Sequence, residues 1–243
     1  MAPSSIWGVI IATRLPWRIS SRELAEMALL SMLGYGGGST LLFLSLLYLP
    51  ASLASMLLYT YPVMVALTEA VLFKQPLTKS KAAALLLACA GLVMVLGTNF
   101  QGINPQGTAL ALAAAVFYTA YLIYGKRVNS YHPPMVTTGY ILAFAAAAYL
   151  GYAVLSGKFS LSFGPTAWYW IAGLGFFGTA LAIFALFAGM KWLRPSQVSI
   201  ISCIEPVFSV VCAALLFGEA ILPLQMVGGV IVLAAIVIIQ VEW

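Results

Sequence analysis

Eight apolar stretches follow one another along this chain, each about 20 residues long, the length a helix needs to cross the hydrocarbon core of a bilayer. Only 7% of the residues are charged and 63% are hydrophobic, whereas a soluble domain carries about a quarter charged residues. The sequence therefore predicts an all-α polytopic membrane protein with about eight transmembrane helices. The predicted spans are 24–48, 51–73, 80–98, 106–125, 134–156, 166–190, 195–217 and 221–241.

Basic residues gather in every second loop between these spans. When the spans are counted off, one side holds all of the 11 Lys and Arg residues except Lys158. Because cytoplasmic loops carry the excess of Lys and Arg, this side is predicted to be cytoplasmic, together with both chain ends. The net charge of +5 follows from these loops and does not indicate a nucleic-acid partner. The residues on the basic side are Arg14, Arg18, Arg22, Lys74, Lys79, Lys81, Lys126, Arg127, Lys191 and Arg194.

The residues that could carry enzyme or metal chemistry are few. The three cysteines lie in apolar stretches without a CxxC spacing, and the chain has one histidine and no aspartate. These patterns argue against a disulfide framework and a metal site. No cofactor and no metal are expected, and an intramembrane enzyme is a poor reading of the sequence. The sequence also lacks an ATP-binding motif, so a carrier of this kind would draw on ion or solute gradients.

The sequence repeats itself with a shift of 144 residues, which places 29–98 on 173–242 without a gap. Pro62-Val63 then matches Pro206-Val207, and the Ser-x-x-Ser that begins at Ser52 matches the one that begins at Ser196. Matched loops differ in charge, a basic loop in one copy corresponding to a neutral loop in the other. Equivalent loops are therefore predicted on opposite sides of the membrane, the pattern of an inverted repeat, which is typical of secondary transporters.

The repeat predicts how the chain is divided. Residues 106–241 form a five-helix repeat, 24–98 form the last three helices of the other copy, and 1–23 are the remnant of a truncated helix plus a cytoplasmic loop. By the same shift, about 40 residues are expected to be missing before Met1. The alternative is that an eight-helix form is genuine.

Several motifs resemble those of the drug/metabolite transporter superfamily, specifically the EamA-type family of two five-helix repeats. The resemblance rests on helix starts rich in small residues, mid-helix prolines and a Gly-Glu before the last helix. Lys74-Gln75 replaces that Gly-Glu in the first copy, and the family's first helix is expected to be missing. The motifs are Leu49–Ser55, Tyr61-Pro62-Val63, Leu193–Ser196, Glu205-Pro206-Val207 and Phe217-Gly218-Glu219.

This resemblance implies a secondary transporter of the inner (plasma) membrane that moves small organic metabolites such as amino acids, usually outward. Its partners would be a small organic substrate and the lipid bilayer, and a homodimer is compatible with the pattern. Alternating access around a mid-membrane site, with coupling to protons as one option, is the mechanism expected for such a carrier. A non-transporting fragment or accessory subunit is the alternative reading.

Glu205 is the leading candidate for a substrate-binding or proton-coupling residue, because a carboxylate inside a membrane helix is costly and usually functional. Pro206 follows it and Pro62 is its repeat partner, so both are expected to kink their helices. Ser202 and Ser209 lie on the same side of a helical wheel as Glu205. The alternative is a protonated Glu205 that serves helix packing alone.

Aromatic residues supply the other candidates. Tyr61 is the repeat partner of Glu205, and Tyr118 and Tyr121 share one face of their helix, where they could contact an amine by cation–π interaction. Each could equally be a core or interfacial residue. Glu69 is expected to reach the basic interface near Lys74 without a functional role. The glycines, including Gly34–Gly38 and Gly228, are expected to allow close helix packing.

Overall fold

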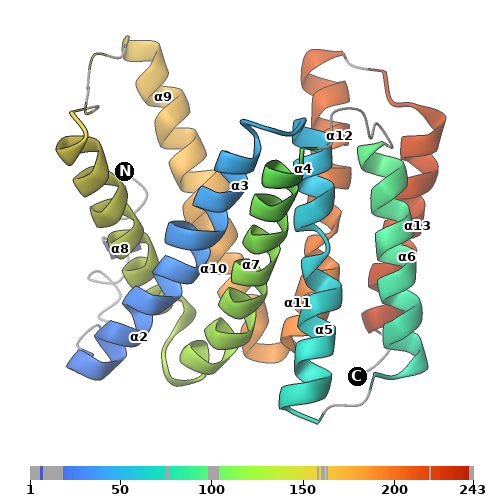
Figure 1. Ribbon diagram of the computed structural model, residues 1–243, viewed down its shortest axis with the longest axis horizontal. Helices are drawn as coiled ribbons and strands as arrows, with labels where there is room; N and C mark the ends of the chain where they lie inside the picture. The colour runs from blue at the N-terminus through green and yellow to red at the C-terminus, as the bar shows by residue number, and fades with distance from the viewer. Residues whose placement is uncertain are drawn as a thin grey trace. The chain divides into compact units, whose positions relative to one another are not determined.

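The structure, a computed structural model, describes residues 6–7, 19–74, 77–97, 104–157, 159, 162, 164–218 and 220–240. Within these ranges the regular structure is entirely helical, and eight helical spans are long and apolar enough to cross a membrane. The predicted fold class, an all-α polytopic membrane protein, is confirmed (Figure 1). The spans are Ser21–Ser45, Ala51–Leu72, Lys79–Leu96, Pro105–Tyr131, Pro134–Leu155, Pro165–Trp192, Pro195–Phe217 and Pro223–Gln240.

Some span boundaries differ from those predicted by hydropathy. Helix α7 (Pro105–Tyr131) continues well past the predicted end at residue 125. Its last turns are polar and bind the end of another helix, so hydropathy alone ends the span too early. Helix α2 (Ser21–Ser31) begins with a capping box, in which the Ser20 hydroxyl accepts from the Glu23 amide and the Glu23 carboxylate accepts from the Ser20 amide. This box satisfies amide groups that a helix start leaves without partners.

Two spans contain a stretch of π-helix. One is η1 (Met32–Ser39), between α2 and α3 (Thr40–Ser45), and the other is η2 (Leu174–Leu181), between α9 (Pro165–Gly173) and α10 (Ala182–Trp192). In η1 the glycines permit a close approach, since a Cβ on Gly37 would lie 2.1 Å from the Phe117 ring. The packing role predicted for the glycines therefore holds at Gly37.

The chain divides into two compact units. Unit 1 comprises residues 1–36 and 124–193, and unit 2 comprises residues 37–123 and 194–243. Within unit 1, α8 (Pro134–Leu155) packs against both α2 and α10. Lys158 and the first five residues, with most of the predicted N-terminal remnant, lie outside the described residues.

Lysines fasten the carboxyl ends of α7 and α10 to each other in unit 1. Lys126 of α7 donates to the carbonyl of Leu193 at 3.0 Å, and Lys191 of α10 donates to the carbonyl of Asn129. The Asn129 amide donates to the Phe187 carbonyl at 2.7 Å. Cations at these helix ends offset the negative end of the helix dipole and satisfy carbonyls that the helices leave open. This contact accounts for the polar extension of α7 past the predicted span.

Unit 2 contains the broken spans and the pocket described below. Helix α6 (Lys79–Leu96) packs along α13 (Pro223–Gln240), and α5 (Tyr61–Leu72) packs against α11 (Pro195–Ser202). The α6–α13 contact depends on Gly91 and Gly228, because a Cβ on either residue would lie 2.7 Å from the other's carbonyl oxygen. Absent side chains let the two backbones touch, as expected for packed membrane helices.

Candidate substrate pocket

Two spans of unit 2 are interrupted near their middles. The span 51–72 divides into α4 (Ala51–Leu58) and α5, with Tyr59 and Thr60 between them. The span 195–217 divides into α11 and α12 (Ile204–Phe217), with Cys203 between them. Pro62 and Pro206 each lie in the first turn after the break. A proline has no N–H to donate to the preceding turn, so these positions are where the regular hydrogen-bond ladder is expected to fail.

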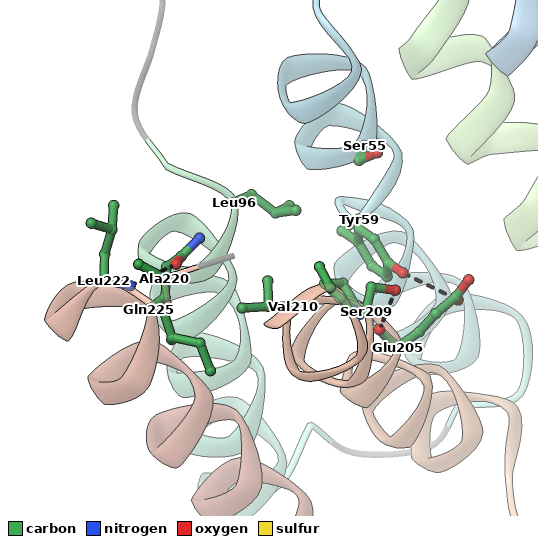
Figure 2. Close-up of a pocket in the computed structure, with 12 residues that line it drawn as sticks. Ser55, Tyr59, Leu96, Glu205, Ser209, Val210, Ala220, Leu222 and Gln225 are labelled. Carbon is green, nitrogen blue, oxygen red and sulfur yellow. Dashed lines mark hydrogen bonds between the residues drawn. The ribbon is translucent and has the colours of Figure 1, made fainter. Parts of the chain in front are cut away.

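The interruptions lie beside a pocket of about 570 Å³ that is formed wholly within unit 2 (Figure 2). Residues from α4, α6, α12 and α13 contribute to its wall. So do Tyr59, between α4 and α5, and residues 220–222, between α12 and α13. Most of the wall is apolar, with a few hydroxyl, amide and carboxylate groups, a composition typical of small-molecule sites. The lining residues are Ser55, Tyr59, Leu96, Glu205, Pro206, Ser209, Val210, Ala213, Ala220, Ile221, Leu222 and Gln225.

Glu205 supplies the only carboxylate among the lining residues that the structure describes. Tyr59 donates a hydrogen bond from its hydroxyl to Oε2 of Glu205 at 3.2 Å. The Ser209 hydroxyl donates to the Glu205 carbonyl at 2.9 Å, one turn along α12. Figure 2 shows these three residues together on one side of the pocket, with Leu222 and Gln225 on the other. The polar groups of the pocket are thus concentrated around one acid.

This arrangement is chemically suited to a cation or a proton. A carboxylate can accept about four hydrogen bonds, and Tyr59 supplies one of them. Among the described residues no Lys, Arg or His lies within ion-pair distance of Glu205. Because no cationic side chain compensates its charge there, Glu205 can serve either as the counterion of an ammonium group or as a proton carrier.

Gln225 shapes the opposite wall of the pocket. Its amide oxygen accepts from the Leu222 amide at 3.0 Å, and its amide nitrogen donates to the Val95 carbonyl at 3.3 Å. The side chain therefore caps the start of α13 and ties it to the end of α6. Its hydrogen bonds hold the wall in place rather than reaching across to Glu205.

The other predicted site residues fall into two groups. Tyr61 is buried, donates to the Ser199 carbonyl at 3.4 Å and does not line the pocket. Its ring lies edge-on to Tyr118, with centroids 4.7 Å apart, and Tyr118 stacks on Tyr121 at 5.7 Å. The three tyrosines therefore form one aromatic cluster, which reaches the pocket through Tyr59, 5.8 Å from Tyr61 between ring centroids.

Ser202 is placed apart from its predicted partners. Its hydroxyl donates to the Val198 carbonyl of its own helix at 2.9 Å, and it is not among the lining residues. The break at Cys203 separates it from Glu205, so a helical wheel drawn through the whole span does not describe the pocket wall. The roles of Ser202, Tyr61, Tyr118 and Tyr121 in substrate binding or coupling stay predictions.

Sequence reasoning missed Tyr59 and misread Glu69. Tyr59 gives no periodic signal of its own, because α4 ends at Leu58 and Tyr59 lies in the break before α5. Glu69 does not reach an interface, since its side chain is only 3% exposed and pairs with Lys81 at 2.9 Å. The expectation that Glu69 snorkels is therefore wrong, because a buried cation from the next helix compensates its charge.

A polytopic helical protein with a largely apolar pocket around one acid, built beside broken helices, has the architecture of a membrane carrier. The chain belongs to the EamA-like transporter family, whose model matches residues 2–97 and 105–241. The predicted family is thereby confirmed. Glu219, part of the Gly-Glu motif quoted for it, lies outside the described residues, and Gly218 ends α12 in the left-handed conformation at φ 70°.

Several curated proteins resemble the chain. An uncharacterized transporter of Archaeoglobus fulgidus is 28% identical over 77% of this chain and 66% of its own length. The threonine/homoserine exporter RhtA of Escherichia coli K12 is 26% identical over 93% of this chain and 75% of its own length. A Salmonella typhimurium protein named "Probable amino-acid metabolite efflux pump" is 24% identical over 88% of this chain and 77% of its own length.

A solved crystal structure shares the fold. It superposes with a TM-score of 0.79 over 99% of this chain and 83% of its own chain, at 22% sequence identity. The family match and these relatives support a multi-pass membrane transporter, and the solved structure shows the same fold.

Proposed function

We propose that the protein is a secondary transporter of the plasma membrane that exports small organic amines, amino acids among them, by alternating access. The observation that carries the proposal is the carboxylate of Glu205, hydrogen-bonded to Tyr59 in a pocket of otherwise mostly apolar walls. An ammonium group placed on this carboxylate would leave the rest of a small substrate against the apolar wall. Export and substrate class draw support from relatives named as exporters of amino acids and of amino-acid metabolites.

Glu205 has two candidate roles within this function, as the counterion of the substrate's ammonium group or as the carrier of a coupling proton. Both require an ionisable carboxylate at this position. They differ in what remains when the charge is removed. A lost counterion abolishes every mode of transport, whereas a lost proton site leaves substrate exchange without net proton-driven movement.

The test replaces Glu205 by Gln, which keeps the size and the acceptor oxygen but removes the charge. Proteoliposomes are loaded with unlabelled threonine, and entry of labelled threonine is followed with and without a proton gradient. We expect Glu205→Gln to abolish gradient-driven accumulation. Loss of exchange as well identifies the ammonium counterion, and retained exchange identifies the proton carrier.

Glu26→Gln is the matched control. Glu26 forms a 3.7 Å pair with Arg22 four residues earlier, and a helix pair of this spacing contributes about 0.3–0.5 kcal/mol to stability. It should transport as the unchanged protein does. Gradient-driven accumulation that survives Glu205→Gln at equal protein content would refute the assignment of Glu205.

A further inference from the structure

A second acid in unit 2 is held in a buried contact of three helices. Glu69, near the end of α5, is 3% exposed, and Lys81, in the first turn of α6, is 4% exposed. Their Oε2 and Nζ atoms lie 2.9 Å apart, and Oε1 of Glu69 accepts from the backbone amide of Ser196 at 3.2 Å. One carboxylate thereby joins α5, α6 and the start of α11.

Stability by itself is a weak reason for this contact. Removing two charges from water costs several kcal/mol, and well-packed apolar residues often replace a buried ion pair without loss. Breaking such a pair by removing one partner is costly, because the remaining charge stays buried. A buried ion pair therefore has two states, formed and separated, that differ clearly in free energy. A gate requires such a pair of states.

The predicted repeat relates this contact to the pocket. Shifted by 144 residues, Ala213 and Gln225 of the pocket wall fall on Glu69 and Lys81, and Tyr59 falls on Cys203. The further pocket residues Ser55 and Glu205 fall on Ser199 and Tyr61. All five of these counterparts are buried. Five positions that line the pocket are therefore matched in the repeat by five buried positions, Glu69 and Lys81 among them.

The two ends differ through identifiable side chains. Ala213 has a single methyl group where Glu69 has a carboxylate that reaches two neighbouring helices. Gln225 binds its own helix start and the end of α6, whereas Lys81 reaches across to α5. Among the described residues, therefore, no ion pair spans the pocket end, whereas the Glu69–Lys81 pair spans the end that carries Lys79 and Lys81.

We infer that Glu69, Lys81 and the start of α11 form the gate that seals the basic end of unit 2 while the pocket is open at the other end. The inference rests on the proposed alternating-access function, in which inverted repeats exchange their conformations. Opening the gate separates Lys81 from Glu69 and gives the basic end the hollow form that the pocket end has here. Glu69 and Lys81 are gate residues and do not bind substrate.

Cys203 is a native reporter for the state of this gate. It is fully buried, and by the 144-residue shift it corresponds to Tyr59 of the pocket wall. With Cys89 and Cys212 replaced by Ala, alkylation by N-ethylmaleimide in membranes reports Cys203 alone. Lys81→Met removes the cation and should raise the alkylation rate of Cys203 about tenfold or more, since a buried carboxylate without its partner favours the open state.

Lys79→Met is the matched control, because Lys79 lies two residues earlier in α6 and is exposed. It should leave the alkylation rate unchanged. An unchanged rate in Lys81→Met, with the protein still monodisperse in detergent, would overturn the gate, and so would an equal rise in Lys79→Met. Measuring the alkylation rate of Cys203 does not require a transported substrate. A failure of the gate can therefore be distinguished from a failure of the proposed transport function.

A second variant tests the gate without disturbing the native pair. Ala213→Glu combined with Gln225→Lys places an acid and a base at the corresponding pocket positions, where they can close that end. Closing the pocket end should shift the protein toward the opposite state and again raise the Cys203 alkylation rate. A rate equal to that of the parent would refute the proposed exchange between the two ends.

Discussion

At the scale of single residues, one hydrogen bond defines how the pocket presents its charge. The Tyr59 hydroxyl orients the Glu205 carboxylate from the connection between α4 and α5, and the Tyr59 ring lies close to that of Tyr61. The ring fixes the position of the hydroxyl, and the hydroxyl fixes the acid. Tyr59 is therefore a positioning residue, whose contribution depends on Glu205.

Tyr59→Phe should keep the ring packing and lose the bond to Glu205. A hydrogen bond to a charged group contributes about 1.5–3 kcal/mol, and the lower end applies because Glu205 is exposed. We expect the apparent affinity for labelled threonine in the exchange assay to fall about tenfold, since about 1.4 kcal/mol corresponds to one factor of ten.

Tyr131→Phe serves as the comparison, since Tyr131 is exposed at the end of α7 in unit 1. Its affinity should not change. A Tyr59→Phe protein with unaltered affinity would show that the hydrogen bond to Glu205 has no part in binding.

At the scale of helices, unit 2 depends on a contact between backbones. Gly91 of α6 and Gly228 of α13 leave no room for a side chain between the two helices. Helix α6 ends and helix α13 begins at the pocket wall, where Leu96 and Gln225 lie. The spacing of α6 and α13 is thus a structural condition for the pocket.

Gly91→Ala should destabilise the protein. Its Cβ would lie 2.7 Å from both the Gly228 carbonyl oxygen and a Val232 methyl group. Backbone cannot move aside as a flexible side chain can, and overpacking of this kind costs about 1–3 kcal/mol. Thermal unfolding in detergent should show a lower melting temperature.

Gly151→Ala gives the opposite expectation, because Gly151 lies in α8 with open space around its Cβ position. Alanine is the better helix former there by about 0.8–1 kcal/mol. Equal melting temperatures for the Gly91 and Gly151 variants would contradict the packing argument.

At the scale of the whole molecule, the loop charges predict an orientation in the membrane. Cytoplasmic positions are expected for both termini and for the loop between α5 and α6, which holds Lys74. The loop between α6 and α7 contains no Lys or Arg and is expected outside. This orientation would make the Glu69–Lys81 end of unit 2 cytoplasmic.

Reporter fusions check the orientation. Green fluorescent protein fused after Trp243 should fluoresce, because it matures in the cytoplasm. Alkaline phosphatase fused after Gln101 should be active, because it folds only after export. Active alkaline phosphatase at the carboxyl terminus would reverse the proposed topology.

The sequence predicts the fold more completely than it predicts the contacts of the candidate site. The fold class and the eight spans follow from apolar length alone, because a chain in a bilayer must satisfy its backbone within each helix. Glu205 stands out in the sequence because placing a charge in an apolar membrane segment has a high free-energy cost. Tyr59 does not stand out, because a tyrosine is common in membrane helices and its partner lies 146 positions away.

The class of protein, the spans, the family and the candidate acid Glu205 all follow from the order of residues in the chain. These depend on local properties, namely the length and polarity of consecutive residues and the cost of a charge in an apolar segment. The packing of the helices, in contrast, brings Tyr59 rather than Tyr61 to Glu205, and it brings Lys81 and the Ser196 amide to Glu69. Those contacts depend on helix breaks of a few residues and on which helices pack together, and neither leaves a periodic pattern in the chain.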